Sequence, residues 1–227
     1  MADSIGLITI DGPSGVGKGT LAALLAEKLG WNYLDSGALY RLTALACIQK
    51  EISLDNIIDD TESKIAEIAR TLDVKFLPQG GVLLEGKEVE ALIRTESAGN
   101  NASKVAVITK VRDALLQRQK NFFQAPGLVA DGRDMGTTVF PQAPLKIFLT
   151  ASAEERAKRR YKQLIEKGIT VKMPDLVVEI QQRDDRDINR SASPLIAAQD
   201  ALTIDTSQLS IDEVYKEVMC LHQQIAV

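Results

Sequence analysis

A glycine-rich segment near the start of the chain constrains the fold more than any other feature. Residues 12–20 read GPSGVGKGT and directly follow the apolar run of residues 5–10. A glycine-rich turn between a strand and a helix lets successive backbone N–H groups face one space, where they bind phosphate oxygens. The helix predicted at residues 18–29 adds its unpaired N-terminal N–H groups, and Lys18 adds a positive charge. The segment therefore predicts a phosphate-binding loop with a nucleoside triphosphate as its ligand.

The loop departs from the usual pattern at one position. A Ser or Thr that binds Mg²⁺ normally follows the lysine, whereas here Gly19 follows it and Thr20 comes next. Direct metal coordination by the loop therefore stays open, with Thr20 as the candidate ligand. A plain glycine turn would explain two of the glycines, but not four of them with a lysine in register.

Composition excludes some classes of partner. The chain has 227 residues and a net charge of −4, which argues against broad binding to nucleic acid or to membrane surfaces. The longest apolar run, residues 21–26, is far too short to span a bilayer. We expect a cytoplasmic protein with small-molecule partners, in which Cys47 and Cys220 are buried free thiols.

Short apolar runs alternate with amphipathic stretches along the chain, which is typical of a parallel sheet wound with helices. We expect an α/β fold with helices on both faces of a five-stranded parallel sheet. The predicted strands are residues 5–10, 32–34, 128–131, 145–149 and 202–205. Ser152 with Glu155, and Ser210 with Glu213, have the spacing of capping boxes at the starts of two later helices.

Residues 74–89 interrupt this alternation with three short β-like pieces, separated by residues 78–81 and by Gly86. We expect a small β-meander inserted into the α/β frame, within approximately residues 73–100, that leans on a neighbouring helix or on ligand. Two interpretations carry equal weight: a hinged gate over a ligand, or an excursion without function.

Charged residues follow two of the predicted strands. Asp131 ends the third strand in the manner of a Walker B carboxylate that orients Mg²⁺, and Arg133 and Asp134 come next. Ser36 and Arg41 follow the second strand. Ligands of open α/β sheets bind beyond the carboxyl ends of the strands, so we expect these side chains at the same edge as the phosphate loop.

Arginines recur in two later segments. If residues 183–190 (RDDRDINR) are helical, Arg183, Arg186, Asp187 and Arg190 share one face. A second basic stripe, Arg156, Arg159 and Arg160, lies on the preceding predicted helix. Two such faces are suited to closing over phosphates, although a solvated, salt-bridged helix explains either stripe equally well.

These motifs together resemble the nucleoside monophosphate kinases, most closely the bacterial cytidylate kinases. The segments GPSGVGKGT, DSGALYR, DGRDMGT and RDDRDINR occur in the order and spacing of that family, and the resemblance covers essentially the whole chain. That family also has glycine after the loop lysine. The resemblance implies a single P-loop kinase domain over residues 1–227, with the insertion near residues 73–100 binding the monophosphate and a short lid at approximately residues 156–170.

The resemblance also implies an activity in pyrimidine nucleotide metabolism: transfer of a phosphoryl group from ATP to CMP and dCMP with Mg²⁺, by a monomer. Lys18, Arg133 and Arg190 would be catalytic. Residues expected to bind ATP are Gly12, Pro13, Ser14, Gly15, Val16, Gly17, Lys18, Gly19, Thr20 and the lid residue Arg159. Residues expected to bind the monophosphate are Ser36, Arg41, Ser103, Arg112, Arg133, Asp134, Arg183, Asp187 and Arg190. Thr20 and Asp131 would hold the metal, directly or through water.

Two alternatives share the phosphate loop. A P-loop kinase for another monophosphate or a small alcohol would not need the full set of base-contacting residues. A GTP-dependent switch normally carries an N-K-x-D motif that reads the base and a D-x-x-G motif after the loop, and neither is present in the sequence.

Overall fold

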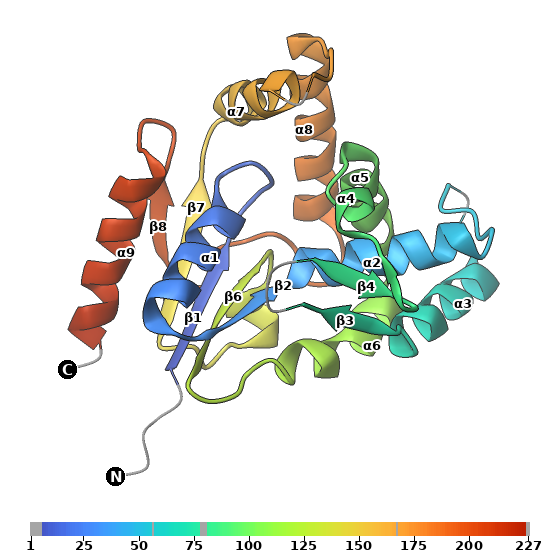
Figure 1. The fold of residues 1–227 in the computed structure, drawn as a ribbon, viewed down its shortest axis with the longest axis horizontal. Helices are drawn as coiled ribbons and strands as arrows, with labels where there is room; N and C mark the ends of the chain where they lie inside the picture. Colours follow the sequence, from blue (N-terminus) through green and yellow to red (C-terminus); the bar gives the residue numbers. More distant parts are fainter. Residues whose placement is uncertain (1–5, 56, 78–80, 167, 226–227) are drawn as a thin grey trace. The chain divides into compact units, whose positions relative to one another are not determined.

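The structure is a computed structural model that describes residues 6–55, 57–77, 81–166 and 168–225. The chain forms two compact units (Figure 1). Unit 1 comprises Met1–Asp35 and Lys120–Val227, and unit 2 comprises Ser36–Gln119. Among the described residues, no helix combines the length and the apolar character needed to cross a membrane.

Unit 1 contains a five-stranded sheet whose strands are all parallel, which confirms the predicted fold class (Figure 1). Its strands are β1 (Gly6–Asp11), β2 (Asn32–Asp35), β6 (Gly127–Gly132), β7 (Leu145–Thr150) and β8 (Leu202–Asp205), in the order β2-β6-β1-β7-β8. All five predicted strands are present, and their ends differ by at most one residue; Ile5 lies outside the described residues. The central strand β1 carries the phosphate loop at its carboxyl end.

Two helices share one apolar core with this sheet. In α1 (Lys18–Leu29), Leu21 and Leu25 are fully buried and pack with Val214 and Val218 of α9 (Ile211–Ile225). Leu24, on the same helix, is 37% exposed. Gly30 ends α1 with a φ of 66°, the left-handed conformation in which glycine commonly caps a helix.

The capping residues predicted for two helices of unit 1 make the expected contacts. At the start of α9, Glu213 accepts hydrogen bonds from the backbone N–H and the hydroxyl of Ser210, at 2.8 and 2.7 Å. At the start of α7 (Ala153–Glu166), the Ser152 hydroxyl accepts from the N–H of Glu155 at 3.2 Å. Both helix starts could therefore be recognised from local sequence.

Two details of unit 1 differ from expectation. The helix α8 (Met173–Asn189) ends before Arg190, whose backbone is extended (φ −65°, ψ 140°), so Arg190 does not continue the helical stripe of Arg183 and Asp187. Cys47, in unit 2, is a buried free thiol as predicted, but Cys220 in α9 is exposed.

Unit 2 combines helices with a small antiparallel sheet. Its elements are α2 (Ser36–Gln49), α3 (Asp59–Arg70), β3 (Val74–Phe76), β4 (Val82–Leu84), β5 (Lys87–Glu88), α4 (Glu90–Ile93), α5 (Glu96–Val105) and α6 (Thr109–Lys120). The three strands confirm the predicted meander; residues 78–80 of its expected turn lie outside the described residues. Val82 and Leu84 pack against Ala38 and Leu42 of α2, so the meander leans on a helix.

Candidate active site

The phosphate loop has the backbone geometry that its glycines predict. Gly12 has a φ of 145°, and a Cβ at this position would lie 2.2 Å from the carbonyl oxygen of Leu149. Gly15 and Gly17 also have positive φ. Lys18 begins α1 with a side chain that is only 6% exposed, and its Nζ donates to the carbonyl oxygen of Pro13 at 2.8 Å. The side chain of Lys18 thus folds back onto the loop.

Asp131, at the end of β6, lies next to this loop within unit 1. Its Oδ1 is 4.0 Å from Lys18 Nζ. A Cβ at Gly19 would lie 3.3 Å from Asp131 Oδ2, which is a tight contact, and 3.6 Å from the hydroxyl of Tyr33, which is an ordinary one. A side chain at this position would therefore press against the carboxylate of Asp131.

Burial perturbs the charged groups beneath the loop. Burial, followed by the nearby charge of Arg133, lowers the pKa of Lys18 to about 7, while Asp131 acts in the opposite direction. Burial raises the pKa of Asp11, the last residue of β1, to about 7, although hydrogen bonds from the backbone of Gly136 and Met135 oppose this shift. Such paired perturbations are typical of functional sites.

Arg133 and Asp187 form an ion pair in unit 1. Nε of Arg133 donates to Oδ2 of Asp187 at 2.9 Å, and Asp187 is 4% exposed. Burial disfavours the charge of Asp187, but Arg133 and Arg183 more than offset it, so its pKa is below the usual value. Arg190, also buried, has Nη2 3.9 Å from Oδ1 of Asp134. Four predicted site residues, Arg133, Asp134, Asp187 and Arg190, thus form two ion pairs.

Four other predicted monophosphate residues, Ser36, Arg41, Ser103 and Arg112, lie in unit 2, whereas Arg183 lies on α8 in unit 1. The hydroxyl of Ser36 donates to Oε1 of Gln119 at 2.6 Å, and Ser36 begins α2. Nη1 of Arg41 donates to the carbonyl oxygens of Ile93 and Thr95 at 2.6 and 3.1 Å. The Arg112 guanidinium lies 5.6 Å from the ring centre of Tyr40, and Ser103 is buried in α5.

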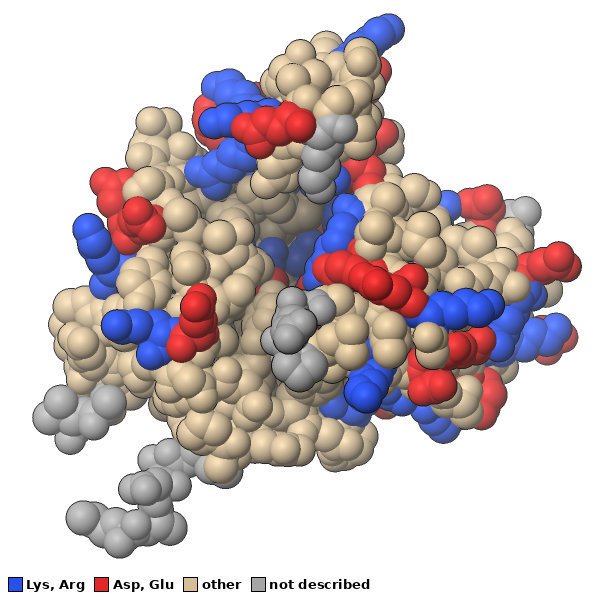
Figure 2. Space-filling model, in the orientation of Figure 1, with Lys and Arg blue, Asp and Glu red and all other residues tan. Residues whose placement is uncertain are grey.

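The arginines expected to form a basic stripe on α7 have partners within unit 1. Arg156 is 4% exposed and makes a two-pronged ion pair with Asp184 of α8, at 3.0 and 2.5 Å. It also donates to the carbonyl oxygen of Ser14 in the phosphate loop at 3.1 Å. Arg159 donates to the carbonyl and hydroxyl oxygens of Thr206. Figure 2 shows both acidic and basic side chains on the visible face of α7.

The donor set beside the loop fits Mg²⁺. The described residues contain no group of three His, Cys, Asp or Glu side chains able to hold a metal ion. Mg²⁺ in phosphate-transfer sites, however, is commonly held by one or two carboxylates together with substrate phosphates. Asp131 supplies such a carboxylate next to Lys18, whereas Thr20 is exposed on α1.

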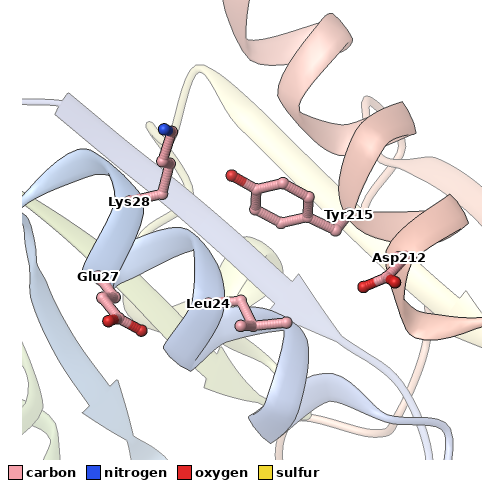
Figure 3. A pocket seen from close by; sticks show the side chains of 5 residues that line it. All are labelled: Leu24, Glu27, Lys28, Asp212 and Tyr215. Carbon is pink, nitrogen blue, oxygen red and sulfur yellow. The ribbon is translucent and has the colours of Figure 1, made fainter.

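A pocket of about 440 Å³ lies elsewhere in unit 1, between α1 and α9 (Figure 3). It is lined by Leu24, Glu27 and Lys28 from α1 and by Asp212 and Tyr215 from α9. Figure 3 shows the Tyr215 ring reaching from α9 towards the side of α1 that bears Lys28. It contains none of the predicted site residues.

Two charged residues that were not predicted as site residues contact the predicted motifs. Asp11 accepts hydrogen bonds from the backbone just after Asp134, and Asp184 holds Arg156. The sequence did contain a signal for Asp11, because its carboxylate ends a buried strand directly before the loop. Asp184 lies 28 residues from Arg156, and no local pattern links them.

Comparison with known proteins gives one consistent family. The family model described as cytidylate kinase matches residues 8–224. A cytidylate kinase of Aeromonas hydrophila subsp. hydrophila is 56% identical over 221 residues, covering 96% of this chain and 94% of the relative. A cytidylate kinase of Shewanella frigidimarina is 55% identical over 224 residues, covering 96% of each chain. Cytidylate kinase 1 of Haemophilus influenzae is 54% identical, covering 97% of this chain and 95% of the relative. The chain therefore belongs to the cytidylate kinase family.

Proposed function

We propose that the protein is an ATP-dependent kinase that transfers a phosphoryl group to CMP and dCMP and releases CDP or dCDP with ADP. Membership of the cytidylate kinase family makes phosphoryl transfer the reaction class. The observation that carries the proposal is the cluster in unit 1 of Lys18 with Asp131, next to the buried pair of Arg133 and Asp187. Positive charges beside a phosphate loop suit a reaction between two anions.

The nucleophile needs no general base. The second pKa of a phosphate monoester is about 6, so the attacking oxygen of CMP is already ionised at neutral pH. The protein must instead align the two phosphates and stabilise the charge of the transition state. We assign Lys18 to the phosphates of ATP, with residues 12–20 and Arg159, and Arg41, Arg133 and Arg190 to the acceptor phosphate. Arg183 and Asp187 are assigned to the ribose.

Mg²⁺ is part of the same proposal. When bound, it would supply positive charge that offsets the negative charge of the ATP phosphates. Asp131 and Thr20 are the residues that we propose to hold it, directly or through water. The closeness of Asp131 to Lys18 supports this assignment for the carboxylate.

Recognition of cytosine is assigned to Ser36, Ser103, Arg112 and Asp134. The exocyclic amino group of cytosine is a donor, which a carboxylate accepts, whereas uracil has an acceptor at that position. Uracil would place an acceptor opposite the buried Asp134 carboxylate, so the hydrogen bond of the base would be lost at a cost of about 1 to 3 kcal/mol. The burial of Asp134, which is 3% exposed, supports this argument.

We also propose the oligomeric state, the location and the ligands of the protein. We expect a monomer in the cytoplasm whose ligands are nucleotides, without nucleic-acid or membrane partners. The net charge of −4 supports the absence of a nucleic-acid footprint. Light scattering at micromolar concentration tests the monomer, since a dimer would double the mass of 24.7 kDa.

The test of the activity is ADP release from ATP and Mg²⁺ with CMP, dCMP, UMP, AMP and GMP offered separately. We expect turnover with CMP and dCMP well above the others. Equal turnover with all five would contradict the base assignment, and turnover with AMP or GMP alone would indicate another P-loop kinase. Slow hydrolysis of GTP without any acceptor would instead indicate a nucleotide switch.

A further inference from the structure

Asp11 connects the phosphate loop to the segment that follows β6. Its Oδ1 accepts from the N–H of Met135 at 2.8 Å, and its Oδ2 accepts from the N–H of Gly136 at 2.7 Å. Both residues belong to the short helical turn η1 (Met135–Val139), whose first N–H groups have no partner within the turn. Asp11 is 5% exposed and directly precedes Gly12, so one buried carboxylate bridges two motifs 124 residues apart in the chain.

The geometry fixes the segment that contains Arg133 and Asp134 at both ends. On one side, Gly132 pairs with Asp11 in the register of β6 with β1. On the other side, the carboxylate of Asp11 holds Met135 and Gly136. Only Arg133 and Asp134 lie between these anchors, so the positions of their backbones depend on Asp11.

Close packing on η1 supports this interpretation. A Cβ at Gly136 would lie 3.0 Å from Thr9 Oγ1, 3.2 Å from Lys146 Cδ and 3.4 Å from Asp11 Oδ2. The turn therefore approaches β1 and β7 closely enough for the carboxylate to reach two successive N–H groups. A carboxyl group has two oxygens, and in Asp11 each of them accepts a hydrogen bond from one of these N–H groups.

We propose that Asp11 is a positioning residue: by holding the N–H groups of Met135 and Gly136, it sets Arg133 and Asp134 in register with the phosphate loop for binding the acceptor nucleotide. This inference rests on the proposed function, because it takes Arg133 and Asp134 to contact the monophosphate. Asp11 itself touches neither substrate.

The test compares Asp11→Asn with Thr9→Val. Asparagine keeps the shape of Asp11 but turns one acceptor oxygen into a donor, so one of the two N–H groups loses its partner. Thr9 lies on the same strand and against the same glycine, and its hydroxyl has no hydrogen-bond partner among the described residues. Valine therefore removes a buried polar atom of similar size without breaking a hydrogen bond.

We expect Asp11→Asn to lower kcat/KM for CMP at least tenfold and the ratio of kcat/KM for CMP over UMP at least fivefold. The Kd for ATP should change less than threefold, because the pairing of β1 with β6 and β7 holds the loop. Thr9→Val should change each quantity less than twofold. Equal behaviour of the two variants, or a loss of activity with an unchanged CMP to UMP ratio, would overturn the proposal.

Two further measurements keep the outcome decisive. If Asp11→Asn does not fold, Gly136→Ala displaces the turn without altering the carboxylate, and the same loss of discrimination is expected. If the unaltered protein does not phosphorylate CMP, the proposed function is wrong. Amide exchange then tests only whether Asp11 holds the N–H groups of Met135 and Gly136. The Met135 and Gly136 amides should exchange at least tenfold faster in Asp11→Asn than in Thr9→Val, and equal rates would contradict the contact.

Discussion

Lys18 shows how burial and chemistry combine at a single residue. Its ammonium group is nearly inaccessible, its pKa is lowered to about 7 by burial and by Arg133, and a carbonyl oxygen of its own loop holds it in place. A charge in such surroundings gains most when an anion approaches, because a low-dielectric site strengthens electrostatic interactions.

Replacing Lys18 tests its assigned role. We expect Lys18→Met to lower kcat by about 100-fold or more, because the charge acts mainly on the transition state. The Kd for CMP should stay within about threefold of the original. Steady-state kinetics and CMP titration measure the two effects. Lys28→Met, an exposed lysine on the same helix, is the control, and an unchanged kcat in Lys18→Met would exclude the role.

Asp134 is expected to govern discrimination between bases. Asp134→Ala should reduce the preference for CMP over UMP by about tenfold, because the exocyclic amino group of cytosine loses the carboxylate that accepts its hydrogen bond, which is worth about 1 to 3 kcal/mol. The ratio of kcat/KM for the two nucleotides measures this. The exposed Asp185 on α8 provides the matched control Asp185→Ala, which should leave the ratio unchanged. A constant ratio in Asp134→Ala would place base recognition elsewhere.

The raised pKa of Asp11 predicts a pH dependence of stability. Between pH 4 and 7 the folded protein holds a proton on Asp11, near Asp134 and Lys18, that the unfolded chain has lost. The free energy of unfolding therefore falls as pH rises, by up to about 1.4 kcal/mol per pH unit from this group. Urea unfolding at several pH values should show this slope in the unaltered protein and its absence in Asp11→Asn. Parallel curves would mean that Asp11 is ionised throughout this range.

At the scale of elements, Arg156 and Arg159 join α7 to the phosphate loop, and Arg156 also joins it to α8. Arg156 bridges Asp184 of α8 and the carbonyl oxygen of Ser14, and it is itself buried. The sequence suggested a basic stripe of Arg156, Arg159 and Arg160, and left open whether it closes over phosphates or is a solvated, salt-bridged face. Only the partner from α8, distant in sequence, decides that Arg156 lies inside and has a structural contact.

Breaking this pair should be costly. We expect Arg156→Met to lower the free energy of unfolding by about 3 kcal/mol, because Asp184 would keep a largely buried charge without its partner. Lys158→Met, on the exposed side of α7, should cost no more than about 0.5 kcal/mol. Urea denaturation compares the two. A loss in Arg156→Met no larger than in Lys158→Met would mean that the pair contributes nothing to stability.

At the scale of the whole molecule, each of the two units contains an apolar core. A core in unit 1 joins the parallel sheet to α1 and α9, and a core in unit 2 joins the β-meander to α2. A unit with a core can unfold locally at a lower free energy than the whole chain. We therefore expect that a substitution in the core of unit 2 can unfold that unit while the sheet of unit 1 stays folded.

Leu84, fully buried in β4, is the probe for the core of unit 2. Leu84→Ala should cost about 2 to 5 kcal/mol through lost burial and a cavity. Amide exchange should quicken in β4 and α2 while β1 and β6 remain protected. Ile58→Ala, at a position 67% exposed in the same unit, should cost less than about 0.5 kcal/mol. Equal loss of protection in both units would show that they unfold together.

The sequence by itself determined the features that depend on local pattern. The five parallel strands, the loop of residues 12–20 with its lysine, the caps at Gly30, Ser152 and Ser210, and the meander all follow from periodicity, glycine placement and capping chemistry. Each involves residues close together in the chain, where backbone geometry and side-chain type constrain one another.

Only the tertiary structure decided which charged residues meet. The pairs of Arg133 with Asp187, of Arg156 with Asp184, and of Asp11 with the turn after Asp134 join residues 28 to 125 positions apart. A charge on a helix or at a strand end carries no sign of its partner, because a solvated surface residue and a buried, paired one share the same local sequence. Burial in the folded chain makes them distinct, by removing water and leaving only the partners that the fold supplies.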